Sequence, residues 1–133
     1  MAYYLKRRVD LGFEEAKERT TEALSDEGFG VLAEIDVEAA LKEKLGLDTY
    51  RRYVILGACN PKLANRALEE EVDLGVLLPC NVVVYVDDDG ETVVSAVDAE
   101  SMLSIVDEES LDPIAEDVVE RFERVLNSLP SAE

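Results

Sequence analysis

Five segments of the chain are predicted to be β-strands, and in the second of them apolar residues recur at every second position. The segments cover residues 3–9, 29–35, 50–59, 77–86 and 92–97. Within the third of them, the stretch YVILGA is apolar at consecutive positions. We therefore expect that strand to run through the middle of a sheet.

Apolar residues at spacings of three and four predict five helices between and after these strands. The helices cover residues 13–28, 36–46, 60–71, 98–106 and 112–129. Asp36, Asn60 and Asp98 stand where an N-cap side chain would accept a backbone hydrogen bond. Pro61 follows Asn60 at the first helical position, which strengthens that helix start. The last helix has the cleanest apolar stripe, so we expect it to pack along the sheet.

The elements therefore follow one another in the order β-α-β-α-β-α-β-β-α-α, without an internal repeat or a linker. A chain of 133 residues suits one hydrophobic core. We predict a single α+β domain over residues 1–133, with a mixed sheet of about five strands and helices packed on it.

The charge of the chain excludes several classes of partner. There are 31 acidic and 13 basic residues and no histidine, so the formal net charge is −18. Such a field repels nucleic acid and anionic membranes, and neither is expected as a partner. The acids are spread over every segment, which favours a surface adapted to concentrated salt, where charges are screened within about 3 Å at 1 M. A basic protein partner is the alternative.

The first eight residues lack the apolar core of a signal peptide, and no apolar run is long enough to cross a bilayer. We therefore expect a cytoplasmic protein. In that compartment the two cysteines would be free thiols, because structural disulfides are rare there.

Cys59 and Cys80 are the residues with the clearest chemical potential. Each is followed by an asparagine, Asn60 or Asn81, and each has a proline within two residues at the end of an apolar run. Cys59 also precedes a predicted helix N-terminus, which favours a thiolate. We predict that all four residues contact a small ligand, or that the two thiols bind a soft metal such as Cu(I), or Zn²⁺ completed by a second subunit.

Two other interpretations of the cysteines stay open. Cys59 could be the reactive thiol of a redox enzyme, assisted by the helix N-terminus. Both cysteines could instead be buried in the core of an interaction module, as free cysteine commonly is. A nucleophile–histidine–acid triad is excluded because the chain has no histidine. No cofactor and no reaction is predicted from these residues.

Other candidate sites are weaker. The acidic run DDDG at residues 87–90 lacks the glycine and glutamate spacing of a calcium loop, so we expect a hairpin turn. The pairs Arg7–Arg8 and Arg51–Arg52 are expected to form salt bridges. Tyr50 and Tyr53 could line a pocket.

Three segments resemble a widespread prokaryotic family known as domain of unknown function 302. They are LKEKLG at residues 41–46, YVILGACNP at 53–61 and GVLLPCNV at 75–82. The resemblance extends over nearly the whole chain and implies a small α+β domain that often forms a homodimer. It implies no activity, since the family's activity is not established.

Overall fold

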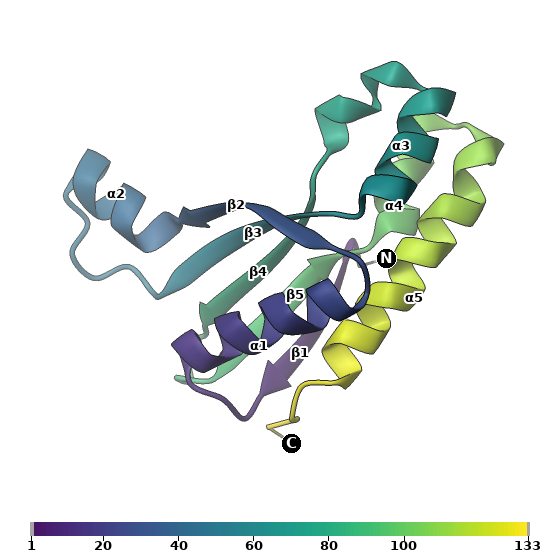
Figure 1. Cartoon of the computed structure of the whole chain (residues 1–133). Coiled ribbons are helices and arrows are strands. Elements are labelled where there is room, and N and C mark those ends of the chain that lie inside the picture. Colours follow the sequence, from purple (N-terminus) through teal and green to yellow (C-terminus); the bar gives the residue numbers. More distant parts are fainter. Residues whose placement is uncertain (1, 133) are drawn as a thin grey trace.

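The computed structural model describes residues 2–132, and its strands and α-helices follow the predicted order (Figure 1). Three short 3₁₀ segments, named η, complete the chain. The elements are β1 (Tyr4–Val9), α1 (Phe13–Asp26), β2 (Gly30–Asp36), α2 (Val37–Leu45), β3 (Tyr53–Cys59), α3 (Pro61–Glu70), η1 (Val72–Leu77), β4 (Cys80–Val86), β5 (Thr92–Val97), α4 (Ala99–Leu103), η2 (Ser104–Val106), η3 (Glu109–Leu111) and α5 (Asp112–Asn127).

The five strands form one sheet in the order β1-β5-β4-β3-β2, and every neighbouring pair is antiparallel. The predicted α+β class and the five strands are confirmed, whereas the prediction of a mixed sheet is wrong. β1 and β2 do run in the same direction, but they form opposite edges with three strands between them. Their parallel relation therefore produces no parallel pairing. β3 is an interior strand, next to the edge strand β2.

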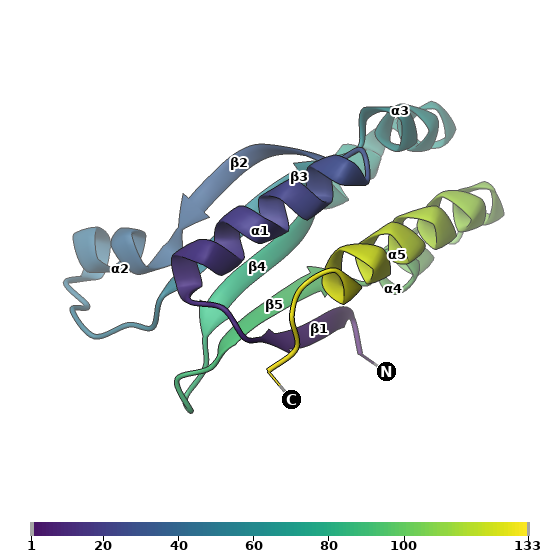
Figure 2. The same ribbon diagram turned by 60° about the horizontal axis from the view of Figure 1, so that its bottom comes forward.

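Helices α1 and α5 cover one face of the sheet, and within residues 2–132 no helix covers the centre of the other face (Figure 2). The alternation in β4 shows the difference between the faces. Val82 and Val84 are fully buried toward the helices, while the intervening Val83 and Tyr85 are only half-buried on the open face. We call these the covered face and the open face.

The hydrophobic core lies between the covered face and the helices. Phe122 of α5 is fully buried, and its ring centre lies 4.8 Å from that of Phe29, which precedes β2. Burial of each such side chain stabilises the fold by about 1.5–3 kcal/mol. The predicted apolar stripe of α5 is confirmed. Its buried members are Ile114, Ala115, Val118, Val119, Phe122, Val125 and Leu126.

The predicted helix caps are confirmed. The Asp36 carboxylate accepts a hydrogen bond from the backbone N–H of Ala39 at 2.9 Å, and Asp98 caps α4 in the same way. The short 3₁₀ segments were not predicted, because one or two turns are too short to show a helical period. α2 ends at Gly46, whose φ of 69° is the left-handed conformation that glycine adopts without strain.

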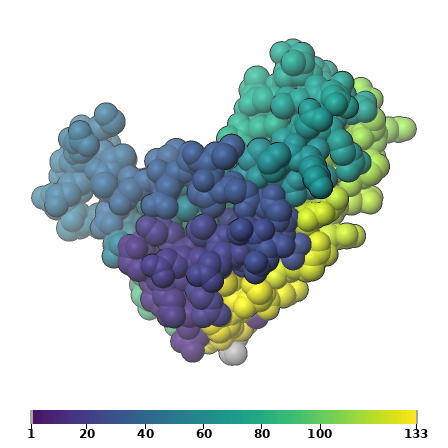
Figure 3. Space-filling model, viewed as in Figure 1, coloured from purple at the N-terminus to yellow at the C-terminus, as the bar shows by residue number. Residues whose placement is uncertain are grey.

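Helix α2 stands apart from the rest of the molecule. It buries none of its own residues, and Figure 3 shows its segment projecting from the body of the protein. Leu45 in its last turn and Leu47 just beyond are exposed. We call β2 and α2 together, with the following residues to Leu47, the β2–α2 arm.

Candidate functional site

The two cysteine-bearing segments meet at one end of the sheet. β3 ends at Cys59 and β4 begins at Cys80, and Cys80 pairs with Ala58 in the antiparallel register. The two cysteines are therefore one position apart on neighbouring strands. Strict strand alternation would place their side chains on opposite faces. Because the chain leaves both strands here, the two residues nevertheless line the same cavity.

This cavity has a volume of about 430 Å³ and lies between α3 and the ends of β3 and β4. Helices α4 and α5 close it from the other side through Met102 and Ile114. No charged side chain lines the cavity, and Asn60 is the one residue of its wall with an amide side chain. The remaining wall is aliphatic or aromatic, apart from the two thiols. We call this the cysteine cavity.

Asn60 holds the wall of the cavity in place. Its side-chain oxygen accepts a hydrogen bond from the backbone N–H of Leu63 at 3.2 Å, which caps α3 as predicted. Its amide nitrogen lies 3.5 Å from the carbonyl oxygen of Glu27. Asn60 is buried, and both ends of its amide already have backbone partners. Any contact that it makes with a ligand would use its remaining hydrogen-bonding capacity.

Asn81 does not line the cysteine cavity. It follows Cys80 directly within β4, so it points to the opposite side of the sheet and lies exposed on the open face. The structure therefore brings Cys59, Asn60 and Cys80 together and separates Asn81 from them. The four predicted ligand-contacting residues do not form one cluster.

Gly57 lets the loop before β4 approach the sheet closely. A Cβ atom at this position would lie 3.0 Å from Cγ of Pro79 and 3.4 Å from Cβ of Ala33. The first distance is shorter than ordinary van der Waals contact. Since Pro79 and Ala33 both line the cysteine cavity, Gly57 helps to set the shape of its wall.

Burial keeps one thiol of the cavity protonated. Desolvation, with a smaller contribution from Cys59, raises the pKa of Cys80 to about 11. Cys80 is therefore a neutral thiol at neutral pH. Both cysteines are free, and Cys59 is half-buried. Within residues 2–132, no group of three or more histidine, cysteine, aspartate or glutamate side chains is placed to hold a metal ion.

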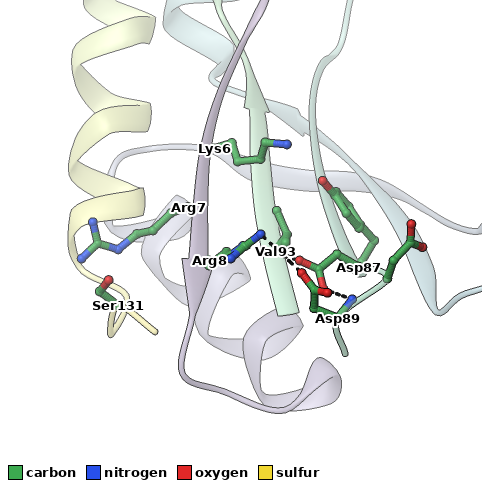
Figure 4. Close-up of a pocket in the computed structure, with 9 residues that line it drawn as sticks. Lys6, Arg7, Arg8, Asp87, Asp89, Val93 and Ser131 are labelled. Carbon is green, nitrogen blue, oxygen red and sulfur yellow. Dashed lines mark hydrogen bonds and ion pairs between the residues drawn. The ribbon is translucent and has the colours of Figure 1, made fainter. Parts of the chain in front are cut away.

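Three of the four paired arginines form salt bridges, as expected, whereas Arg7 donates a hydrogen bond to the carbonyl oxygen of Leu129 at 3.2 Å. Arg8 reaches toward the hairpin turn, with Nε 3.5 Å from Asp87 and Nη2 3.8 Å from Asp89 (Figure 4). Arg51 pairs with Asp88 at 2.6 Å. Arg52 pairs with two glutamates of the neighbouring helices. The hollow beside the hairpin is therefore occupied by groups that neutralise one another. The acidic run is a hairpin turn, as predicted.

Sequence reasoning did not identify the aliphatic side of the cysteine cavity. Leu63, Ala67 and Met102 lie within the predicted helices at residues 60–71 and 98–106, as apolar helix residues. Their spacing is the same whether a helix packs tightly or leaves a cavity, so no sequence signal separates the two cases. The predicted pocket at Tyr50 and Tyr53 corresponds to a broad hollow on the open face.

Comparisons with known proteins place the chain among uncharacterised relatives. The family model of Domain of unknown function DUF302 matches residues 5–129. The chain is also similar to the crystal structure of an uncharacterized conserved DUF302 protein from Bacillus stearothermophilus. That similarity has 35% sequence identity and a TM-score of 0.90, and it covers 97% of this chain and 99% of the other. No curated protein matches. In the described part of the chain, no helix is long and apolar enough to span a membrane.

Proposed function

The chain belongs to the family described as Domain of unknown function DUF302, and from the geometry of its site we propose that it binds a small apolar molecule in the cysteine cavity. The observation that carries this proposal is an uncharged cavity of about 430 Å³ beside two thiols. Sites for small molecules are typically concave, mostly apolar and a few hundred Å³ in volume, with a small number of polar groups. The cysteine cavity has this composition.

Its lining also decides which ligands fit. A charged ligand would lose its hydration without gaining a charged partner, because no acidic or basic side chain lines the wall. An apolar ligand would gain the contacts that the wall lacks while the cavity is empty. Asn60 and the thiol of Cys59 would then contact any single polar group on the ligand.

The alternative of a thiol-dependent enzyme has less support. A nucleophilic thiol is favoured as its thiolate by a base, a neighbouring cation or a helix N-terminus, and Cys59 has only the N-terminus of α3 near it. Neither kind of side chain lines the cysteine cavity, and the pKa of Cys80 is raised rather than lowered. The alternative that the cysteines are core residues fits Cys80, which belongs to the buried hydrophobic cluster.

A soft metal is the second candidate ligand, because both thiols line one wall. Cu(I) accepts soft sulfur ligands, and two thiolates from this chain could bind it. The raised pKa of Cys80 opposes this, since the metal must displace the thiol proton. Metal analysis of protein purified without chelators tests this candidate. Stoichiometric copper that is lost in Cys80→Val would support it, and metal-free protein would contradict it.

The apolar ligand can be tested with 2-methylnaphthalene as a neutral probe. Amide NMR shifts should saturate with added probe and concentrate around α3 and the start of β4. Ala64→Phe adds a ring to the wall of the cavity and should abolish the shifts. The matched control is Asn65→Phe, which places the same ring on the exposed side of α3 and should leave binding intact. Equal binding by the two variants, or no saturable shift in the unaltered protein, would contradict the proposal.

We further propose a homodimer that forms through the β2–α2 arm. β2 is an edge strand with unpaired backbone groups, and such edges pair readily with a second copy. Leu32, Ile35 and Leu45 are exposed on the arm, by 73%, 51% and 67% respectively. Light scattering at high salt should therefore give a dimer mass. Leu45→Glu should shift the mass toward the monomer, whereas Ile105→Glu, at an exposed site outside the arm, should not. A monomer mass for the unaltered protein would contradict the proposal.

We also propose that the protein works in a salt-rich cytoplasm. The net charge of −18 destabilises the compact state at low ionic strength, and two free thiols suit a reducing compartment. The midpoint of thermal unfolding should rise between dilute buffer and about 1 M potassium chloride, where screening is nearly complete. A midpoint that stays flat or falls would contradict salt adaptation and would favour a basic protein partner.

A further inference from the structure

The open face carries a second hollow, separate from the cysteine cavity and built around tyrosine. Its volume is about 580 Å³, and β1, β5, β4 and β3 all contribute to it. All five tyrosines of the chain line it, although they come from distant parts of the sequence. They are Tyr3, Tyr4, Tyr50, Tyr53 and Tyr85. We call this the tyrosine hollow.

The tyrosine hollow differs in charge from the rest of the surface. Acidic side chains make up 31 of the 133 residues, but none is among the twelve residues that line the hollow. Arg51 at its rim is neutralised by Asp88. Lys6 forms no ion pair with any carboxylate of residues 2–132, and its ammonium lies 5.0 Å from the ring centre of Tyr4. Figure 4 shows Lys6 on the same side of β1 as Arg8, away from Arg7. Lys6 therefore supplies one positive charge that is outside any ion pair, although it also lines the hollow that Asp87, Asp88 and Asp89 line.

Hydrogen-bond donors also gather in the tyrosine hollow. The hydroxyl groups of Tyr50, Tyr53 and Tyr85 have no hydrogen-bond partner within residues 2–132. Burial is the main cause that raises the pKa of Tyr53. The nearby residues Tyr50, Tyr85 and Tyr3 raise it further. The hydroxyls are thus close enough to influence one another, and that of Tyr53 keeps its proton. A protonated phenol donates a hydrogen bond to an anion.

Two stacked aromatic rings form part of the wall of the tyrosine hollow. The rings of Tyr53 and Tyr85 are stacked with 12° between their planes and 5.4 Å between their centres. Val83 and Val97 extend the same surface across β4 and β5. An aromatic ligand can pack against the edges of these rings and against the two valines.

We propose that the tyrosine hollow binds an aromatic carboxylate with a single negative charge. The carboxylate pairs with Lys6 and accepts hydrogen bonds from the tyrosine hydroxyls, while the aromatic ring packs against Tyr53, Tyr85 and Val83. One charge is preferred because one ammonium is outside any ion pair of residues 2–132 and the rest of the protein repels anions. A second copy of the chain is a poorer occupant of the hollow. In a two-fold dimer the hollows of the two copies would face each other, so donors would meet donors and ammonium groups would meet ammonium groups.

The probe for this site is 2-naphthoate, which has nearly the shape of 2-methylnaphthalene but carries a carboxylate. In about 1 M potassium chloride, where the overall field is screened, 2-naphthoate should cause saturable amide shifts around Lys6, Val83 and Ser95. Lys6→Gln should weaken its binding about threefold, because an exposed ion pair contributes up to about 1 kcal/mol and salt screens it. The control Lys62→Gln removes an equally exposed lysine from α3 and should leave the affinity unchanged.

Other results would overturn the proposal. Equal affinities for Lys6→Gln and Lys62→Gln would show that the ammonium is not a ligand contact. Shifts around the cysteine cavity instead of the open face would assign the probe to the other site. Shifts of the open-face amides on simple dilution, without probe, would show that a second copy covers the hollow. The double variant Tyr53→Phe/Tyr85→Phe keeps both rings but removes their hydroxyl groups, so it should bind 2-naphthoate more weakly. An unchanged affinity would show that the hydroxyl groups do not contact the ligand.

Discussion

The two faces of the sheet differ in burial, although the same strands form both. On the covered face, Leu56 pairs with Val82, and both are fully buried under the helices. One residue earlier on β3, Ile55 pairs with Val83 on the open face, and both are half-buried. Both pairs are aliphatic, so their type does not reveal which face packs against helices. The helices and the charges around each face make the difference.

Each face also carries a different kind of concavity. The cysteine cavity on the covered side has no charged group, while the tyrosine hollow has donors and an ammonium outside any ion pair of residues 2–132. Burial is therefore concentrated on one face, and exposed hydrogen-bond donors are concentrated on the other. The predictions below test that division.

The largest difference is expected between two neighbouring residues of β3. Leu56→Ala removes a fully buried side chain and should lower the free energy of unfolding by about 3 kcal/mol. Ile55→Ala removes a half-buried side chain and should cost about 1 kcal/mol. Urea unfolding at constant high salt measures both. Equal losses of unfolding free energy in the two variants would mean that the open face is covered as fully as the helices cover the covered face.

The buried thiol gives the covered side a pH dependence. The pKa of Cys80 is about 11 in the folded protein and 9.0 for an ordinary thiol. The unfolded chain therefore loses this proton first as the pH rises, and the folded state is disfavoured. The contribution of Cys80 is fully present below pH 9 and should fall by up to about 3 kcal/mol as the pH passes through 11.

The control for this effect is Cys80→Val, which retains an apolar side chain of similar size. The difference in unfolding free energy between the two proteins should change over that alkaline range, while the titration of the tyrosines and lysines is common to both. A difference that stays constant with pH would contradict burial of the Cys80 thiol.

A smaller effect is expected at Thr20, on the side of α1 that faces the sheet. Its hydroxyl is buried, and no described residue is its hydrogen-bond partner. Thr20→Val should therefore raise the free energy of unfolding by about 1 kcal/mol, because an unsatisfied polar group is removed. The neighbouring Thr21 donates to the carbonyl oxygen of Lys17 at 2.9 Å, so Thr21→Val should bring no gain. Equal effects of the two changes would show that Thr20 has a water partner.

The sequence predicted the elements well because their signals are local. Asp36 and Asn60 cap helices through residues three positions away, so the pattern of the chain contains the whole interaction. The order of the strands in the sheet is not determined by such local interactions. The positions of β1 and β2 at opposite edges depend on contacts between distant segments. Because local patterns do not contain those contacts, the sheet was predicted as mixed.

The candidate site was predicted in part for a related reason. Cys59–Asn60 and Cys80–Asn81 look alike as dipeptides, but Asn60 begins a helix and Asn81 lies inside a strand. Two successive residues of a strand point to opposite faces. That rule separates Cys80 from Asn81, and it could have been applied before the structure was known. The volume of the cysteine cavity could not have been predicted from the sequence, because it depends on how closely α3 approaches the sheet.

The division between the two faces can be tested most directly in a single NMR experiment with both probes on the isotopically labelled protein in concentrated potassium chloride. The account predicts that 2-methylnaphthalene shifts amides around Leu63 and Cys80, that 2-naphthoate shifts amides around Lys6 and Val83, and that neither probe displaces the other. If both probes shift the same amides and compete, the two faces do not differ in what they bind, and the account is wrong.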